Sequence, residues 1–98
     1  MIDMHGPAQA GTPAQESARP TGKRLAELYE RVLRVADVQQ DDDFFVLGGT
    51  SLSAIELLDL IAEELGVRVP VGDFYRATGV AELADVVDAR ATEPAGGV

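Results

Sequence analysis

Apolar residues recur every three or four positions in three separate segments, and this periodicity constrains the fold more than any other feature of the sequence. Such spacing places apolar side chains along one face of an α-helix. No run of alternating apolar and polar residues is long enough to indicate a β-strand. The three helical faces comprise Leu25, Leu28, Tyr29, Val32 and Leu33; Ala54, Leu57, Leu58, Ile61 and Leu65; and Leu83, Val86 and Val87.

Capping and helix-breaking residues predict where these helices begin and end. Thr21 is a candidate N-cap for the first helix, and Gly66 is a typical stop for the second. Pro70 and Gly72 then leave room for a single short helical turn. We therefore predict an all-α fold, a small four-helix bundle with a long loop between its first and second helices. The elements expected after the first helix are a helix from Ser51 to about Leu65, a short turn over 73–77 and a helix from Val80 to Arg90.

The two ends of the chain lack this periodicity. The first 20 residues carry three prolines and two glycines with little apolar content, and the chain ends in TEPAGGV. Segments of this composition bury too little apolar surface to offset the entropy lost on ordering. We expect disordered tails over 1–20 and 92–98, and one folded domain over 21–91.

Charge and composition argue against several classes of function. Seventeen acidic and eight basic residues give a net charge of −9, which disfavours binding to nucleic acid or to an anionic membrane and favours a basic protein partner. The chain has no cysteine, so thiolate metal sites, disulfides and a cysteine nucleophile are excluded, and His5 is its one histidine. With no membrane-length apolar stretch and no signal peptide, we expect a cytoplasmic protein.

The second helix carries more apolar surface than its core face requires. Leu52 and Ile55 lie well outside the face that begins at Ala54. Acidic residues flank them, and no Lys or Arg occurs between Arg34 and Arg68. An apolar patch rimmed by charge is typical of a transient protein interface, so docking of a partner is one interpretation. Packing of both side chains beneath the long loop is the other.

Ser51 follows Gly48, Gly49 and Thr50 at the expected start of the second helix. Glycines permit a tight turn with positive φ and leave the serine hydroxyl accessible. A helix N-terminus accommodates a phosphate group through its partial positive charge and free N–H groups. Esterification of Ser51 by a phosphate is therefore one interpretation. The alternative is an ordinary N-cap, in which Thr50 or Ser51 satisfies an N–H group of the helix.

Catalytic and metal-binding interpretations of this region find less support. The segment GGTSLS lacks the G-x-S-x-G pattern of a nucleophile elbow, and His5 lies in the expected tail, so no Ser–His pair is predicted. The glycine-rich loops that bind nucleotide phosphates are also absent. Asp41, Asp42 and Asp43 lack the spacing of a calcium loop, and we interpret them as solvated or interfacial.

The segment over 41–58, DDDFFVLGGTSLSAIELL, closely resembles the core motif of peptidyl carrier (thiolation) domains of nonribosomal peptide synthesis. These phosphopantetheine-binding carrier proteins typically read D-x-F-F-x-L-G-G-x-S-L, and the predicted helices follow the family's order over 22–90. Position 50 departs from the motif, because these domains more often have His, Asp or Asn where this chain has Thr50. The matching residues are Asp42 or Asp43, Phe44, Phe45, Leu47, Gly48, Gly49, Ser51 and Leu52.

The resemblance implies that Ser51 is the attachment site of 4′-phosphopantetheine, transferred from coenzyme A by a phosphopantetheinyl transferase with magnesium. The thiol of this arm would carry an aminoacyl or related acyl group as a thioester, loaded by an adenylation enzyme and passed to condensation or tailoring enzymes. The chain itself would be a non-catalytic, monomeric carrier. We expect it to be free-standing, and a domain excised from a longer synthetase is the alternative. Expected partner contacts are Thr50, Leu52, Ile55 and Glu56, whereas Phe44, Phe45 and Leu47 are expected to pack the loop onto the bundle.

Other functions stay open at this point. The chain could be an acyl or aryl carrier for polyketide or siderophore assembly, although the Asp-Ser-Leu core usual in fatty-acid and polyketide carriers is absent. It could also be an unmodified helical interaction module that retains the motif. A hydrolase that uses Ser51 has the least support, because no preorganised histidine base is predicted.

Overall fold

The computed structural model describes residues 20–92. Within this range lie four α-helices and one π-helical turn, η1, which continues α4, and no strand; an isolated β-bridge joins Asp43 to Gly79. The all-α prediction is therefore confirmed. The tails expected over 1–20 and 92–98 lie outside the described residues, except for Pro20 and Thr92. The elements are α3 (Pro20–Leu33), α4 (Ser51–Leu60), η1 (Ile61–Leu65), α5 (Val71–Tyr75) and α6 (Val80–Ala91).

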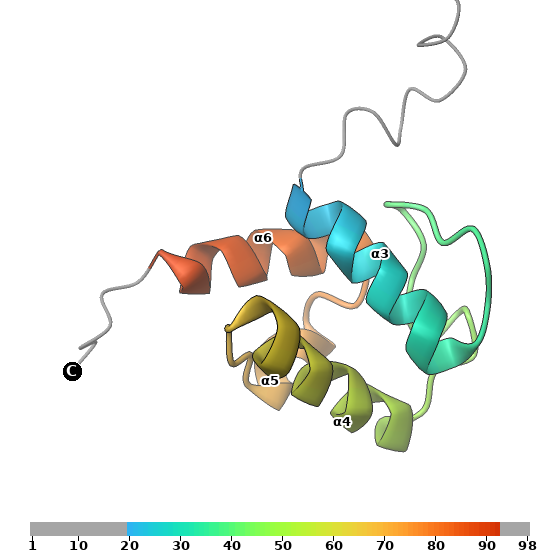
Figure 1. The fold of residues 1–98 in the computed structure, drawn as a ribbon. Helices are drawn as coiled ribbons and strands as arrows, with labels where there is room; N and C mark the ends of the chain where they lie inside the picture. Colours follow the sequence, from blue (N-terminus) through green and yellow to red (C-terminus); the bar gives the residue numbers. More distant parts are fainter. Residues whose placement is uncertain (1–19, 93–98) are drawn as a thin grey trace, which may run out of the picture.

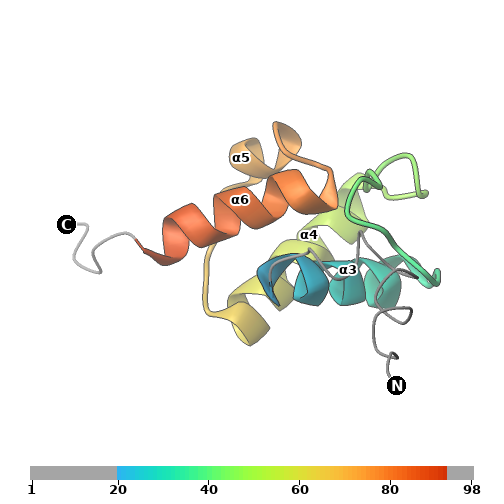
Figure 2. The ribbon, with the colours of Figure 1, turned by 90° about the horizontal axis from the view of Figure 1, so that it is seen from above.

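The first long helix, α3, packs against both α4 and α6. Figures 1 and 2 show the loop over 34–50, in green, along one side of the bundle, with α4 beginning where this loop ends. The long loop predicted between the first two helices is thus present, and it delivers the chain to the N-terminus of α4.

Three aromatic rings form the centre of the core. Tyr29, Phe44 and Phe74 are fully buried, and the Phe44 ring meets Tyr29 at 5.3 Å and Phe74 at 5.4 Å, both edge to face. Edge-to-face contacts favour aromatic pairs beyond the burial of their area. The loop therefore contributes a central core residue, Phe44. Most residues of the predicted helical faces are buried. Four of them are only half-buried, and these are Val32, Leu33, Leu65 and Val86.

Backbone hydrogen bonds attach the loop to the start of α6. The N–H of Val80 donates to Asp42 at 3.1 Å, and that of Ala81 donates to Gln40 at 2.9 Å. The first N–H groups of a helix have no partner within it, so the loop carbonyls satisfy groups that would otherwise need water or a cap. The loop is thereby held to α6 before it reaches α4.

Thr78 joins three elements at the base of this loop. Its carbonyl oxygen accepts the Tyr29 hydroxyl at 2.8 Å and the Phe44 N–H at 3.0 Å, and its hydroxyl donates to the Asp43 carboxylate. Burial raises the pKa of the Tyr29 phenol, and the nearby charges of Asp43 and Glu82 raise it further. The phenol therefore stays protonated and donates its hydrogen bond from inside the core.

Two of the loop aspartates accept hydrogen bonds that stabilise the loop, so their interpretation as solvated or interfacial is wrong. Asp43 Oδ2 accepts the N–H groups of Phe45 at 2.9 Å and Val46 at 3.1 Å, and Asp42 accepts a backbone N–H at 2.8 Å. The Thr78 hydroxyl, followed by these two N–H groups, holds the pKa of Asp43 below its usual value, although burial acts in the opposite direction. Asp43 thus shapes the turn that follows it.

The start of α3 differs from the prediction. The helix begins at Pro20, so Thr21 lies in its first turn and is not the N-cap. The Thr21 hydroxyl instead donates to Asp88 at 2.6 Å, joining α3 to α6. Proline suits the first helical position because its φ is already fixed and it lacks the N–H that would go unpaired there.

The short helix also begins earlier than predicted, at 71–75 instead of 73–77. Pro70 holds an extended backbone with ψ of 146° and serves as the N-cap, so the helix starts immediately after it. The second helix continues to Leu65 as predicted, although its last turn is π-helical, and it ends at Gly66 with φ of 72°. The last helix begins at Val80, as predicted, and runs to Ala91.

Candidate functional site

Two glycines with different structural roles precede α4. Gly48 has φ of +109°, a backbone conformation that side chains disfavour. Gly49 has an ordinary φ, but a Cβ atom there would lie 2.3 Å from the Phe44 ring. Only Gly48 therefore meets the predicted need for positive φ, and Gly49 is required by close approach to the core.

Thr50 is the N-cap of α4. Its side-chain oxygen accepts the Ser53 N–H at 3.1 Å, and its own N–H donates to the Ser53 hydroxyl at 2.7 Å, which completes a capping box. This arrangement decides between the two capping alternatives: Thr50 caps the helix and Ser51 does not. Ser51 is the first residue of the helix.

The Ser51 side chain is exposed at the N-terminus of α4. The first turn contains no acidic side chain, and the partial positive charge of the helix terminus favours an anion there. Because the cap is Thr50, the Ser51 hydroxyl is not needed to stabilise the helix. A phosphate ester at Ser51 therefore fits both the space and the electrostatics of this site.

Tyr75 of α5 lies beside Ser51, with its hydroxyl 3.5 Å from Ser51 Oγ. Its ring stacks on Phe45 at a centroid distance of 5.6 Å and an interplanar angle of 9°. Tyr75 was not predicted as a site residue, because the short helix expected over 73–77 begins two residues too late and local sequence does not define its orientation. Phe45 is half-buried and packs against the core, as predicted for this part of the loop.

Exposed apolar side chains lie on the same helix as Ser51 and on other parts of the described chain. Leu52 is 71% exposed and Ile55 is 46% exposed, so neither packs beneath the loop. This agrees with their position outside the core face of the helix. Their role in partner binding stays a prediction. Three further large apolar residues are exposed but were not predicted to be so, and these are Val46, Val71 and Tyr75.

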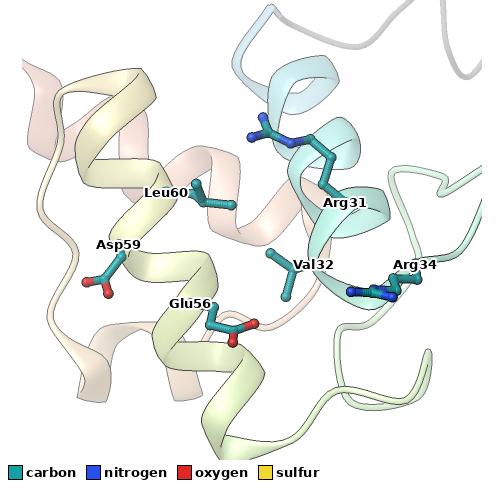
Figure 3. A pocket seen from close by; sticks show the side chains of 6 residues that line it. All are labelled: Arg31, Val32, Arg34, Glu56, Asp59 and Leu60. Atoms are coloured by element: carbon teal, nitrogen blue, oxygen red, sulfur yellow. The ribbon is translucent and has the colours of Figure 1, made fainter.

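Glu56, a predicted partner contact, is exposed on α4 and borders a groove of about 420 Å³ between α3 and α4. Figure 3 shows Val32 and Leu60 facing the space between the two helices. Charges of both signs line this groove, so it presents no single electrostatic preference. Partner contacts by Glu56 and Thr50 stay predictions. The lining residues are Arg31, Val32, Arg34, Glu56, Asp59 and Leu60.

Residues 20–92 contain no group of three or more His, Cys, Asp or Glu side chains arranged to hold a metal ion. None of the helices in the described part of the chain is long and apolar enough to cross a membrane.

Comparison with known proteins identifies the class of this site. The family described as "Phosphopantetheine attachment site" matches residues 23–87. The chain is 38% identical over 76 residues to a dimodular nonribosomal peptide synthase of Bacillus subtilis (strain 168), covering 78% of this chain and 3% of that protein. It is 40% identical over 80 residues to pyochelin synthetase PchE of Pseudomonas aeruginosa (strain UCBPP-PA14), covering 82% of this chain and 6% of that protein.

A solved structure shows the same fold. It contains the phosphopantetheine transferase Sfp in complex with coenzyme A and a peptidyl carrier protein. The matching chain superimposes with a TM-score of 0.71 at 30% identity, covering 74% of this chain and 95% of that one. In contrast, this chain spans only a small fraction of the length of the two synthetases.

In this helical bundle a Gly-Gly turn leads into α4, Thr50 caps the helix, and the exposed Ser51 is its first residue. These are features of a carrier domain. The chain belongs to the family of phosphopantetheine attachment domains, because this family matches more than half of the chain. Its prosthetic group is 4′-phosphopantetheine. The predicted family, fold and cofactor are therefore confirmed, whereas attachment at Ser51 and free-standing status stay predictions.

Proposed function

We propose that Ser51 carries 4′-phosphopantetheine and that the chain serves as a peptidyl carrier in nonribosomal peptide synthesis. The observation that carries this proposal is the Ser51 hydroxyl, exposed at the first position of α4 while Thr50 performs the capping. The likeness to a nonribosomal peptide synthase and to a peptidyl carrier protein supports the class of pathway.

Attachment is a phosphoryl transfer to Ser51. Its Oγ forms a bond to the coenzyme A phosphorus that bears the pantetheine, the pyrophosphate linkage breaks, and adenosine 3′,5′-bisphosphate leaves. The hydroxyl proton passes to a base of the transferase, since within residues 20–92 the side-chain neighbour of Ser51 Oγ is the Tyr75 hydroxyl, which is a weak base. The attached arm supplies the thiol that holds an aminoacyl group as a thioester, so the chain needs no cysteine of its own.

The surface around Ser51 suits brief contacts with several enzymes. Leu52 and Ile55 provide exposed apolar area on α4, flanked by Thr50 and Glu56. The net charge of −9 favours basic partner surfaces and fast encounter, and the small apolar area favours rapid release. The proposed partners are a phosphopantetheinyl transferase, an adenylation enzyme, and condensation or tailoring enzymes; the complex of Sfp with a peptidyl carrier protein supports the first.

The carrier is proposed to be non-catalytic, cytoplasmic and monomeric. A serine nucleophile needs a general base within hydrogen-bond reach. Within residues 20–92, the side-chain group within hydrogen-bond reach of the Ser51 hydroxyl is the Tyr75 phenol. A phenol is a poor candidate for a general base. A monomer can pass Ser51 between enzymes without first dissociating from a second copy.

Intact-protein mass spectrometry tests the attachment site. The chain is incubated with coenzyme A, magnesium and a broad-specificity phosphopantetheinyl transferase, beside Ser51→Ala and the control Ser53→Ala. We expect one added phosphopantetheine on the wild type and on Ser53→Ala, and none on Ser51→Ala. No addition to the folded wild type would overturn the proposal and favour an unmodified interaction module.

Loading of the modified protein tests the class of cargo. Aminoacyl, aryl and malonyl groups are offered in parallel by enzymes specific for each, and the thioester is detected by its loss on treatment with hydroxylamine. Aminoacyl loading supports the peptidyl carrier. Exclusive loading with aryl or malonyl groups would instead identify an acyl or aryl carrier.

A further inference from the structure

The Tyr75 phenol is a side-chain donor placed directly beside Ser51. Its hydroxyl is directed at Ser51 Oγ over 3.5 Å, longer than the 2.5–3.0 Å of an ordinary O–H···O hydrogen bond. Within residues 20–92 this hydroxyl makes no other hydrogen bond. The donor is therefore aimed at Ser51 but is not satisfied by it.

Packing fixes the position of this donor. The Tyr75 ring stacks on Phe45 at 5.6 Å and meets Phe74 at 5.7 Å with an interplanar angle of 59°. Phe74 is fully buried, and Phe45 packs against the core. Two anchored rings thus hold the phenol, so little side-chain freedom is left to lose when its hydroxyl gains a partner.

The hydroxyls of the residues closest to Ser51 on the chain are already occupied, and no cationic residue lies beside it in the sequence. The hydroxyls of Thr50 and Ser53 form the capping box. The sequence has no Lys or Arg between Arg34 and Arg68, and the Arg76 guanidinium pairs with a carboxylate at 2.8 Å. Within residues 20–92, Tyr75 supplies the side-chain donor that lies against Ser51 Oγ, at 3.5 Å, beside the helix N-terminus.

We propose that the Tyr75 hydroxyl donates a hydrogen bond to a non-bridging oxygen of the phosphodiester formed at Ser51, and thereby directs the arm toward α5. This inference rests on the proposed attachment at Ser51. Esterification replaces the serine proton with phosphorus, whose non-bridging oxygens extend beyond Oγ. An O–H that stops short of Oγ then meets a charged acceptor, and such bonds shorten to about 2.5–2.7 Å.

The test compares two modified proteins by ³¹P NMR. Tyr75→Phe keeps the ring on Phe45 and removes only the donor, and amide spectra confirm an unchanged fold. We expect the phosphodiester resonance of modified Tyr75→Phe to differ from that of the modified wild type by more than its linewidth. It should also move toward the resonance of the modified wild type unfolded in denaturant. Tyr29→Phe, which removes the chain's other phenol, serves as the control and should leave the folded resonance in place.

The Tyr75 ring gives a second readout. The ¹³Cζ resonance of Tyr75 in the wild type should shift when the arm is attached, whereas that of Tyr29 should not. Identical ³¹P resonances in modified wild type and Tyr75→Phe would overturn this inference and leave the attachment intact. A wild type that gains no phosphopantetheine, as judged by its intact mass, would overturn the proposed function and this inference together.

Discussion

The Phe44 ring occupies the space in which any side chain of Gly49 would have to lie. A Cβ atom at Gly49 would fall 2.3 Å from two ring carbons of Phe44 and 2.8 Å from its carbonyl oxygen. The Gly49 N–H donates to that same carbonyl at 2.9 Å. One buried residue of the loop therefore shapes both the core and the turn that leads into Ser51.

Gly49→Ala should destabilise the fold by about 1–3 kcal/mol, because the methyl group overpacks against Phe44. Urea unfolding followed by circular dichroism measures the change. The double variant with Phe44→Leu tests the cause, since a smaller side chain should relieve part of the clash and make the two effects less than additive. Full additivity would show that the Phe44 ring is not the obstacle.

Thr50→Ala should lower stability by about 0.5–2 kcal/mol, since it removes the side-chain cap of α4. Ser51→Ala, at the next position, should change stability by less than about 0.5 kcal/mol, because its hydroxyl takes no part in the cap. Thermal unfolding of the two variants side by side gives the comparison. A larger loss for Ser51→Ala than for Thr50→Ala would mean that the serine hydroxyl is chiefly structural.

Asp43→Ala should cost about 1–3 kcal/mol at neutral pH, because two loop N–H groups and the Thr78 hydroxyl lose their charged acceptor. Asp41→Ala, at an exposed neighbouring position, is the matched control and should stay within about 0.5 kcal/mol of the wild type. Denaturant unfolding measures both variants.

The effect of Asp43 should also depend on pH in a defined direction. Its folded-state pKa lies below the ordinary value of 3.8, chiefly through the Thr78 hydroxyl. The carboxylate therefore contributes its full stabilisation above about pH 4 and loses it as the pH falls through the folded-state pKa. The stability difference between wild type and Asp43→Ala should shrink only in that acidic range. A difference that grew on acidification would contradict this assignment.

Leu52→Glu and Ile55→Glu should slow modification by the transferase or loading by the adenylation enzyme, because they place charge in the apolar surface beside Ser51. Each should leave stability within about 0.5 kcal/mol, since both side chains are exposed. Leu57→Ala, at a fully buried position of the same helix, should instead cost about 2–5 kcal/mol. A collapse in the melting temperature of either Glu variant would show that the outward face is misassigned.

Local pattern was enough to predict the helices but not all of their ends. Helical spacing located the core faces, and Gly66 was correctly predicted to end the second helix. The predicted starts of α3 and α5 were wrong because each start depends on a proline. Pro20 is the first residue of α3, whereas Pro70 immediately precedes α5. Proline can begin a helix or precede one, and the spacing of apolar residues does not distinguish these cases.

Long-range contacts account for what the sequence did not reveal about the site. Motif and periodicity pointed to Ser51, Leu52 and Ile55, all on one helix. Tyr75 is 24 residues from Ser51, and only the packing of α5 on Phe45 brings the two hydroxyls together. The role of Asp43 depends equally on Thr78, which lies 35 residues away. Neither pairing leaves a signal in local sequence.

Peptide mapping of the modified protein tests the central claim most directly. Because no Lys or Arg occurs between Arg34 and Arg68, trypsin releases 35–68 as one peptide, in which Ser51 and Ser53 are the only serines. Fragmentation of this peptide should locate the phosphopantetheine on Ser51. Its location on Ser53 or Thr50, or its absence from this peptide, would contradict the assignment of Ser51 as the attachment site.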